Sequence, residues 1–426
     1  MKIEIKNGHV IDPANGIDKP ADVYVADGRI VAVGKSPNGF AAEGSIDAGG
    51  CIVCPGLVDL AARLREPGFE YKATLESEMA AAAAGGVTSL ACPPDTDPPL
   101  DEPGLVEMLK HRARLPDFAH VYPIGALTLG LAGERLTEMA ELAEAGCIAF
   151  GQANTVVLNT QVLMRAMQYA ATFGFPVWLA AQDPYLAKDG VAHDGEVSAR
   201  LGLAGIPVVA ETIALATVLH LAQETGARLH VTRISSAAGL DMVRAARLAG
   251  IAVTCDISAH HLHLCENDIG YFDPHARLDP PLRAAADRDA LRAGLADGTV
   301  DALCSDHTPV DDDGKQAPFG EAEAGATGLE LLLPLMLKWS RATKVPLAQA
   351  LARVTSEPAR ILGIEAGSLD IGRAADICVF DPHAKVRVTR QRLKSQGKNT
   401  PFLGQELPGE VRYTLIEGHL AYSPPL

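Results

Sequence analysis

The feature that most constrains the fold is a regular alternation of strand-like and helix-like segments through the middle of the chain. Short apolar runs are each followed by a longer segment with helical spacing, at intervals of roughly 25 to 35 residues, which is the rhythm of βα units. Strands are predicted at 52–60, 87–91, 119–124, 147–150, 176–179, 229–231, 251–254 and 300–305, and helices at 74–84, 134–144, 159–172, 211–224, 238–249, 328–341 and 347–362. Eight such strands fit a (β/α)₈ barrel, although periodicity alone leaves a doubly wound sheet open.

The two ends of the chain have a different character, with short alternating strands separated by turns. Near the start, Asp27-Gly28 lies between two such strands and predicts a hairpin, because glycine tolerates the positive φ of a tight turn. Segments 375–380 and 413–422 alternate in the same way. We therefore predict a small β-sandwich domain built from both termini, residues 1–54 plus 366–426, around a barrel domain spanning 55–365.

Composition indicates a globular protein with a large core and limits its partners. The chain has 426 residues, of which 48% are hydrophobic and 21% charged, and its net charge is −16. That charge argues against nucleic acid or an anionic membrane as partner. The start, Met1 to Lys6, alternates like a strand rather than a signal peptide, and no apolar run approaches the roughly 18 residues of a membrane helix. The eight cysteines show no disulfide framework, so a cytoplasmic location is predicted.

One stretch connects this chain to a known family. The sequence Pro55-Gly-Leu-Val-Asp-Leu-Ala-Ala-Arg-Leu-Arg-Glu-Pro-Gly68 closely resembles the first barrel strand of dihydroorotases, which are cyclic amidohydrolases. In that family the strand reads roughly Pro-Gly-Leu-Ile-Asp-x-His-x-His-Leu-Arg-Glu-Pro-Gly. The resemblance extends over essentially the whole chain and implies the (β/α)₈ TIM barrel rather than the doubly wound sheet.

The same resemblance implies a set of metal-ligand positions, and most of them carry other residues here. In active relatives, imidazoles and carboxylates bind zinc, which activates water and polarises an amide carbonyl. Here the ligand positions are replaced after the first, fourth, fifth and sixth strands, and only Asp306 is kept, after the eighth. The replaced positions are Ala61, Arg63, Ala153, Ala180 and Arg233. Because alanine cannot ligate and a guanidinium is cationic with no acceptor, we predict that no zinc is bound.

The arginines lead to a specific hypothesis. Arg63, Arg233 and Asp306 stand at ligand positions of one metal centre, so they should converge in the barrel mouth. An uncompensated charge there would be unfavourable, so at least one arginine is expected to pair with Asp306 in place of zinc.

Substrate-binding positions are only partly kept. Arg65 matches the family arginine that holds the substrate carboxylate, with a salt bridge at the barrel mouth as the alternative. Polar residues of three family motifs are replaced in this chain. The replacements are Pro94 after the second strand, Asp279 between the seventh and eighth strands, and Val310 after the eighth strand. The resemblance therefore implies vestigial roles for Arg65 and for Asp306.

Three other groups of residues could carry chemistry. His260, His261 and His263 cluster after the seventh strand, where packing is favoured over a zinc site because neighbours in an extended segment point to opposite faces. Ser235-Ser236 with Asp306-His307 could form a hydrolytic triad, but the chain lacks a Gly-x-Ser-x-Gly elbow. Cys51-Ile-Val-Cys54 is a lone CxxC in a strand, and the acidic loop 311–320 is expected to be solvated and mobile.

Within the family, the sequence resembles a non-catalytic dihydroorotase-like chain that assembles with aspartate transcarbamoylase in some bacteria. The resemblance implies a structural and regulatory subunit of pyrimidine biosynthesis that is not an enzyme and has no cofactor. It also implies the aspartate transcarbamoylase catalytic chain as partner and a homodimer core within a larger hetero-oligomer. The alternative is an active but divergent zinc-dependent dihydroorotase or related cyclic amidohydrolase. A ligand-binding sensor that uses the old pocket, with Arg65 as its anchor, is a third possibility.

Overall fold

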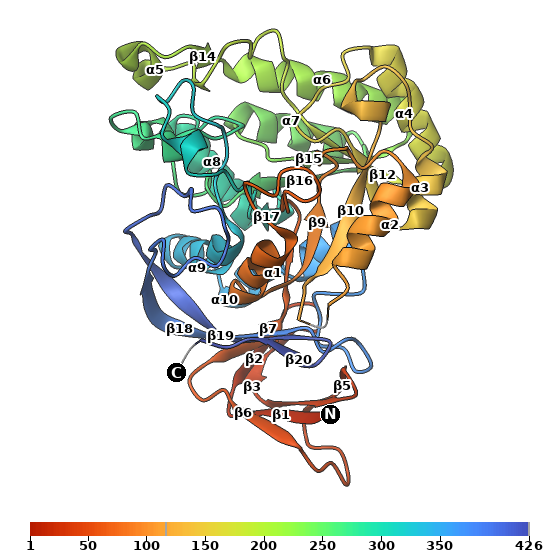
Figure 1. Cartoon of the computed structure of the whole chain (residues 1–426), viewed down its shortest axis with the longest axis vertical. Coiled ribbons are helices and arrows are strands. Elements are labelled where there is room, and N and C mark those ends of the chain that lie inside the picture. Colours follow the sequence, from red (N-terminus) through yellow and green to blue (C-terminus); the bar gives the residue numbers. More distant parts are fainter. Residues whose placement is uncertain (116, 425–426) are drawn as a thin grey trace.

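The centre of the molecule is a barrel of parallel strands surrounded by helices (Figure 1). The structure is a computed structural model and describes residues 1–115 and 117–424. In that part of the chain, an eight-stranded parallel sheet consists of β8 (Leu57–Asp59), β9 (Val87–Cys92), β10 (His120–Ala126), β11 (Ala149–Gly151), β12 (Pro176–Ala180), β15 (Arg228–Thr232), β16 (Val253–Ser258) and β17 (Ala302–Cys304). This confirms the predicted barrel and excludes the doubly wound sheet.

The barrel closes just beyond the ends of its first and last strands. Ala62 and His307 form a parallel bridge. The amide of His307 donates to the carbonyl of Ala61 at 2.9 Å, and the amide of Arg63 donates to the carbonyl of His307 at 2.9 Å. Two of the predicted site positions, 61 and 63, thus lie on the closing seam.

Helices follow the strands and bury the outer face of the sheet. They are α1 (Leu75–Ala84), α2 (Pro103–Arg112), α3 (Met139–Ala145), α4 (Thr160–Phe173), α5 (Glu196–Leu201), α6 (Val208–Thr225), α7 (Ala237–Leu248), α8 (Ala285–Asp297), α9 (Leu332–Thr343), α10 (Leu347–Ala352) and α11 (Ser356–Leu362). Their ends follow local chemistry. For example, the side chain of Asn159 caps α4 by accepting from the amide of Gln161 at 3.0 Å, and Gly174 ends the helix at a φ of 73°.

Several predicted boundaries differ from the structure. The first predicted strand, 52–60, is two strands, because β7 (Ile52–Pro55) joins a terminal sheet and only β8 enters the barrel. The predicted helix 347–362 is broken between α10 and α11, and α3 begins at Met139 rather than near residue 134. Helices α2, α5 and α8 were not predicted.

Segments from both termini build two further sheets beside the barrel, at the lower end of Figure 1. One has the order β5 (Arg29–Gly34), β4 (Asp22–Ala26), β1 (Lys2–Lys6), β6 (Gly44–Asp47). The other has the order β20 (His419–Tyr422), β19 (Glu406–Ile416), β18 (Ile377–Arg387), β7, β2 (His9–Asp12), β3 (Ile17–Pro20). The short strands β13 (Ala192–His193) and β14 (Gly205–Ile206) pair separately.

The two terminal sheets share one apolar core. Ile5 and Val23 from the first sheet pack with Val53 and Val379 from the second, and all four are fully buried. The predicted hairpin at Asp27-Gly28 is confirmed, with φ of 50° and 77° between β4 and β5. The exact division at residues 54/55 and 365/366 stays a prediction.

The barrel interior is filled by side chains, including Val58, Ala91, Ile124 and Trp178. The strands are therefore a packed support, and polar groups are left to gather at the strand ends. None of the helices in the described ranges is long and apolar enough to cross a membrane.

Candidate active site

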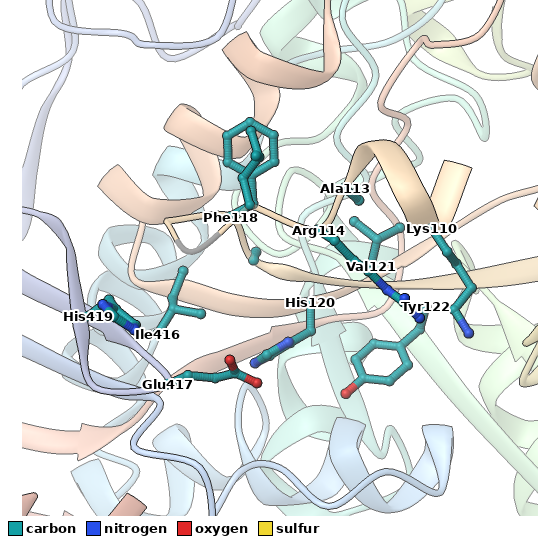
Figure 2. A pocket seen from close by; sticks show the side chains of 12 residues that line it. Lys110, Ala113, Arg114, Phe118, His120, Val121, Tyr122, Ile416, Glu417 and His419 are labelled. Atoms are coloured by element: carbon teal, nitrogen blue, oxygen red, sulfur yellow. The ribbon is translucent and has the colours of Figure 1, made fainter. Parts of the chain in front are cut away.

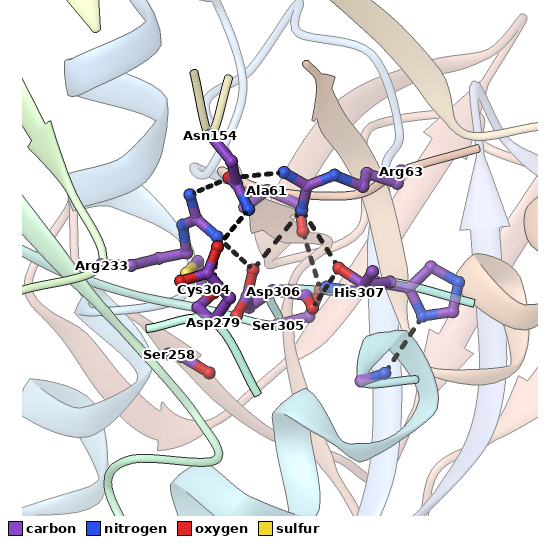
Figure 3. Close-up of polar contacts among 12 residues, drawn as sticks. Ala61, Arg63, Asn154, Arg233, Ser258, Asp279, Cys304, Ser305, Asp306 and His307 are labelled. Carbon is purple, nitrogen blue, oxygen red and sulfur yellow. Dashed lines mark hydrogen bonds and ion pairs between the residues drawn. The ribbon is translucent and has the colours of Figure 1, made fainter. Parts of the chain in front are cut away.

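Polar residues that follow six barrel strands meet at the carboxyl ends of those strands. This is the end at which (β/α)₈ enzymes place their reactive groups. Figure 3 shows four of these residues, Arg63, Asn154, Arg233 and Asp306. The residues that converge are Arg63 after β8, Asp95 after β9, Asn154 after β11, Gln182 after β12, Arg233 after β15 and Asp306 after β17.

Asp306 lies between the two arginines, as the ligand-position hypothesis predicted. Its Oδ1 is 3.3 Å from Nη1 of Arg233 and 3.7 Å from Nη1 of Arg63. All three side chains are at most 7% exposed. The predicted pairing of arginine with Asp306 is therefore confirmed for both guanidiniums.

Asn154 connects the two guanidiniums from the solvent side. Its Oδ1 accepts from Nη2 of Arg63 at 2.9 Å and also from Nη2 of Arg233. Its Nδ2 donates to Asp279 at 3.0 Å, and Gln182 donates to the other oxygen of Asp279 at 3.2 Å. An exposed amide side chain thus closes a network of buried charges.

The charges of this network shift one another's proton affinities. Burial raises the pKa of Asp306 to about 6, and the two arginines only partly offset that effect. Burial works against the charge of Arg63, but Asp95 and Asp306 more than compensate and raise the pKa of its guanidinium. At neutral pH the centre therefore holds fixed cations beside an acid that titrates close to neutrality.

The backbone at the site is strained. Arg65, Ala153, Arg233 and Asp306 have φ between 47° and 63°, a region that residues other than glycine seldom adopt. Each such residue stores on the order of 1 to 3 kcal/mol, and such strain clusters at functional sites. Three of the four stand at ligand positions that the family resemblance implies, and of these only Asp306 keeps a side chain that can ligate a metal.

The predicted vestigial substrate residue Arg65 is half-buried beside this network. Its Nε donates to the carbonyl of Pro309 at 2.9 Å. Arg65 forms no salt bridge with any described residue, so the alternative prediction is not met. The terminal Nη groups of Arg65 donate to none of the described residues. Burial and the charge of Arg63 lower the pKa of Arg65 to about 10, so it remains cationic at neutral pH.

The hydrolytic-triad alternative is wrong, because its members have other partners. His307 Nε2 contacts Glu78, and His307 Nδ1 accepts from the amide of Gly328 at 3.0 Å. The hydroxyls of Ser235 and Ser236 both donate to the buried carboxylate of Glu211. These groups fasten strand ends to helices α1 and α6.

The histidine cluster packs rather than converging on one point, as favoured from the sequence. His260 stacks on Phe402, with ring centroids 5.9 Å apart. His261 Nε2 is 3.1 Å from the carbonyl of Pro280, and His263 Nε2 is 2.8 Å from that of Leu335. Burial lowers the pKa of these imidazoles to about 3, 4 and 3, so they are neutral.

The loop after β17, residues 311–320, is largely in contact with solvent, as expected, but two of its side chains are buried. Phe319 and Lys315 are buried. The ammonium of Lys315 donates to three carbonyls, at 2.6 Å to Glu323, 3.0 Å to Pro274 and 3.3 Å to Arg277. Arg390 also binds Asp312. The buried ammonium of Lys315 therefore holds the loop against the neighbouring segment that contains Pro274 and Arg277.

The residues present do not fit zinc. Within the described ranges, no three His, Cys, Asp or Glu side chains lie together as a metal-ligating group. Asp306 is a single carboxylate beside two permanent cations, and cations repel a divalent ion where it would bind. The space left between Ala61, Arg63, Ala153 and Arg233 is a cavity of about 40 Å³.

Several site residues were missed from the sequence, chiefly Asn154, Asp95, Glu78 and Glu211. Asn154 and Asp95 each directly follow a position that the sequence analysis names, Ala153 and Pro94. Their position after barrel strands was a usable signal. Glu78 and Glu211 lie inside helices, and nothing in the local sequence distinguishes them from solvent-facing acids.

Comparison with known proteins identifies the family. Residues 50–238 match the family described as "Dihydro-orotase-like". A "Dihydroorotase-like protein" of Pseudomonas aeruginosa is 44% identical over 422 residues, which cover 99% of this chain and 100% of that protein. A protein of Syntrophotalea carbinolica named "Dihydroorotase" is 42% identical, with 99% of each chain covered.

Among solved structures, the L-hydantoinase (dihydropyrimidinase) from Arthrobacter aurescens has a TM-score of 0.87 at 25% identity, covering 99% of this chain and 96% of that one. These findings overturn the prediction that the chain is not an enzyme, since relatives named dihydroorotase match it at full length and hydantoinases share its structure. That prediction equated the loss of zinc ligands with the loss of all chemistry, whereas a strained and charged centre remains. The chain belongs to the dihydroorotase-like family of amidohydrolases.

Proposed function

We propose that this chain is a divergent cyclic amidohydrolase that opens or closes the ring amide of a small carboxylated substrate, of the dihydroorotate type. The single observation that carries the proposal is Asp306, held in a left-handed backbone between two buried guanidiniums at the catalytic end of the barrel. Full-length similarity to proteins named dihydroorotase supports the substrate class.

Asp306 is the proton-transfer group of the proposed reaction. With a pKa of about 6 it is largely a carboxylate at neutral pH and can accept a proton from water as the water oxygen bonds to the amide carbon. It then gives that proton to the ring nitrogen as the carbon–nitrogen bond breaks. The products are a carboxylic acid and an open-chain amide nitrogen, and ring closure is the reverse.

Arg63 and Arg233 supply the positive charge for the carbonyl oxygen. Their Nη2 groups already share one amide oxygen, that of Asn154. A substrate carbonyl in the same place would receive the same two donors, which would stabilise the negative charge that develops there. Because the adjoining cavity is only about 40 Å³, the exposed side chain of Asn154 must swing out for substrate to enter.

Arg65 holds the substrate carboxylate. Its Nη groups are without a partner among the described residues, and a guanidinium binds a carboxylate through two parallel hydrogen bonds. Arg65→Ala should therefore raise KM more than it lowers kcat.

The test is an assay of both reaction directions, dihydroorotate opening and carbamoyl aspartate closure, with and without EDTA. We expect turnover that survives EDTA, rises through pH 6 in the opening direction, and falls at least about a hundredfold in Asp306→Asn. Asp27→Asn, on the exposed hairpin, is the matched control. Absence of turnover in folded protein between pH 5 and 9 would overturn the proposal, as would activity that EDTA abolishes.

We also propose assembly with the aspartate transcarbamoylase catalytic chain, from the resemblance in the barrel-strand motifs. A supporting observation is a group of exposed apolar side chains, Leu158, Tyr185, Val209 and Ile213, beside a cavity of about 200 Å³ between α4 and α6. Co-purification followed by light scattering should give a hetero-oligomer that Leu158→Asp with Ile213→Asp weakens. A homodimer that these changes dissociate, with no transcarbamoylase bound, would assign the surface to a second copy instead.

A further inference from the structure

A second pocket lies at the opposite end of the barrel from Asp306. It is a cavity of about 510 Å³ between the last turn of α2, the start of β10 and the turn between β19 and β20 (Figure 2). Its volume is in the range of pockets that bind small organic molecules. Because β10 begins there, at His120, the pocket faces the amino ends of the barrel strands, where this fold does not place its chemistry.

Cationic side chains line the pocket in a chain that is acidic overall. Lys110 and Arg114 both reach it, and neither forms an ion pair with any described residue. His419 is a third basic group on its wall. Unpaired cations around a cavity attract an anion, and lysine and arginine together are the usual donors to phosphate.

The remaining polar groups suit a molecule larger than phosphate alone. His120 Nε2 binds Asp376 at 3.0 Å; burial disfavours its charge, but Asp376 outweighs that effect and raises the pKa of His120. Glu417 lies on the exposed side of the pocket with its carboxylate available as an acceptor, as sugar hydroxyls require.

Aromatic and apolar groups complete the lining. Tyr122 and Phe118 are half-buried aromatic residues of the lining, and Val121 and Ile416 add apolar surface. A planar heterocycle stacks on such rings.

From this combination we propose that the pocket, lined by Lys110, Arg114, Phe118, Tyr122 and Glu417, is a binding site for a nucleoside phosphate. Lys110 and Arg114 hold the phosphate, Glu417 accepts from the sugar hydroxyls, and the base lies against Tyr122. The site is separate from the proposed catalytic centre, because it lies at the other end of the barrel strands.

The experiment is calorimetric titration of the full chain with AMP and UMP, with adenosine and inorganic phosphate as partial ligands. We expect at least one nucleotide to bind, about tenfold or more tightly than either partial ligand, because each contributes only part of the contacts. Lys110→Ala with Arg114→Ala should weaken nucleotide binding by about ten- to a hundredfold, since two charge-assisted contacts are lost.

The matched control is Lys188→Ala with Arg200→Ala, which removes the same charge from exposed positions outside the pocket. It should leave nucleotide binding unchanged. Millimolar nucleotide without measurable binding would overturn the proposal, and so would equal weakening by both double variants. Because the readout is binding, failure here leaves the amidohydrolase proposal untouched, and loss of turnover leaves this one untouched.

Discussion

At the scale of single residues, Asp306 is a buried acid that two arginines contact and whose pKa is nevertheless raised. Two guanidiniums contact one of its oxygens, yet burial still raises its pKa to about 6. The folded state therefore binds a proton between about pH 4 and 6 that the unfolded chain has released. Because the raised pKa belongs to an acid, stability falls as pH rises through that window and stays lower above it.

This gives a prediction for Asp306→Asn. The substitution removes the titration, so the free energy of unfolding of the variant relative to the natural chain should increase by about 1.4 kcal/mol between pH 5 and pH 8. Urea unfolding at the two pH values measures it. A difference that is the same at both pH values would mean that the pKa of Asp306 is not raised in the folded chain.

The sequence predicted which charged residues meet at this site, but not the hydrogen bonds that join them. Arg63, Arg233 and Asp306 could be brought together because they occupy positions of one family metal centre. Asn154, which bridges the guanidiniums, could not, because its role depends on a side-chain direction fixed by Ala153 in a left-handed conformation. Such backbone geometry at alanine leaves no trace in the sequence.

At the scale of elements, buried carboxylates fasten helices to the carboxyl ends of strands. Glu211 in α6 accepts from the amides of Ser235 and Ser236, at 2.8 and 3.1 Å, and from both hydroxyls. Those serines lie where β15 leads into α7, so one side chain ties α6 to the next βα connection. Breaking a buried network of this kind typically costs several kcal/mol because donors are left without acceptors.

We therefore predict that Glu211→Ala lowers the free energy of unfolding by about 3 to 5 kcal/mol. The control is Glu224→Ala, on the same helix but exposed, which should change it by less than about 0.5 kcal/mol. Chemical denaturation with circular dichroism at pH 7 checks both. Similar values for the two variants would show that Glu211 does not fasten α6.

Element prediction from the sequence succeeded where periodicity was strong. The barrel strands were found near their observed positions because buried parallel strands are continuous apolar runs. The failures are short or polar elements: α8 begins Ala285-Ala-Asp-Arg-Asp and α2 is mostly charged on its exposed side, so neither shows a clear apolar stripe. The break between α10 and α11 follows tertiary contacts, since the carbonyls of Arg353 and Val354 accept from the amides of Leu303 and Val58.

At the scale of the whole molecule, the chain has the barrel of its family, and charged side chains stand where the family resemblance implies a metal ion. Charged side chains from several strand ends neutralise one another there, so the fold needs no metal ion to hold those ends together. In proteins with a structural zinc, the ion contributes roughly 10 kcal/mol or more to folding.

The corresponding prediction concerns metal content. Protein purified from zinc-supplemented medium should contain substoichiometric zinc, and EDTA should leave its Tm unchanged. Elemental analysis and calorimetry measure the two quantities. One zinc per chain that survives dialysis, together with a fall in Tm on chelation, would contradict the assignment of the centre to arginine and aspartate.

Lys315 is a buried amine in the loop that follows β17. Burial and the neighbouring Arg277 lower the pKa of its amine to about 7, yet three carbonyls cover that amine while the loop is closed. An acylating reagent at neutral pH can modify it only in molecules whose loop has opened. The acylation rate of Lys315, followed by peptide mass spectrometry, would therefore report how often the loop beside the active site opens. The acylation rates of exposed lysines in the same sample give the reference for a fully accessible amine.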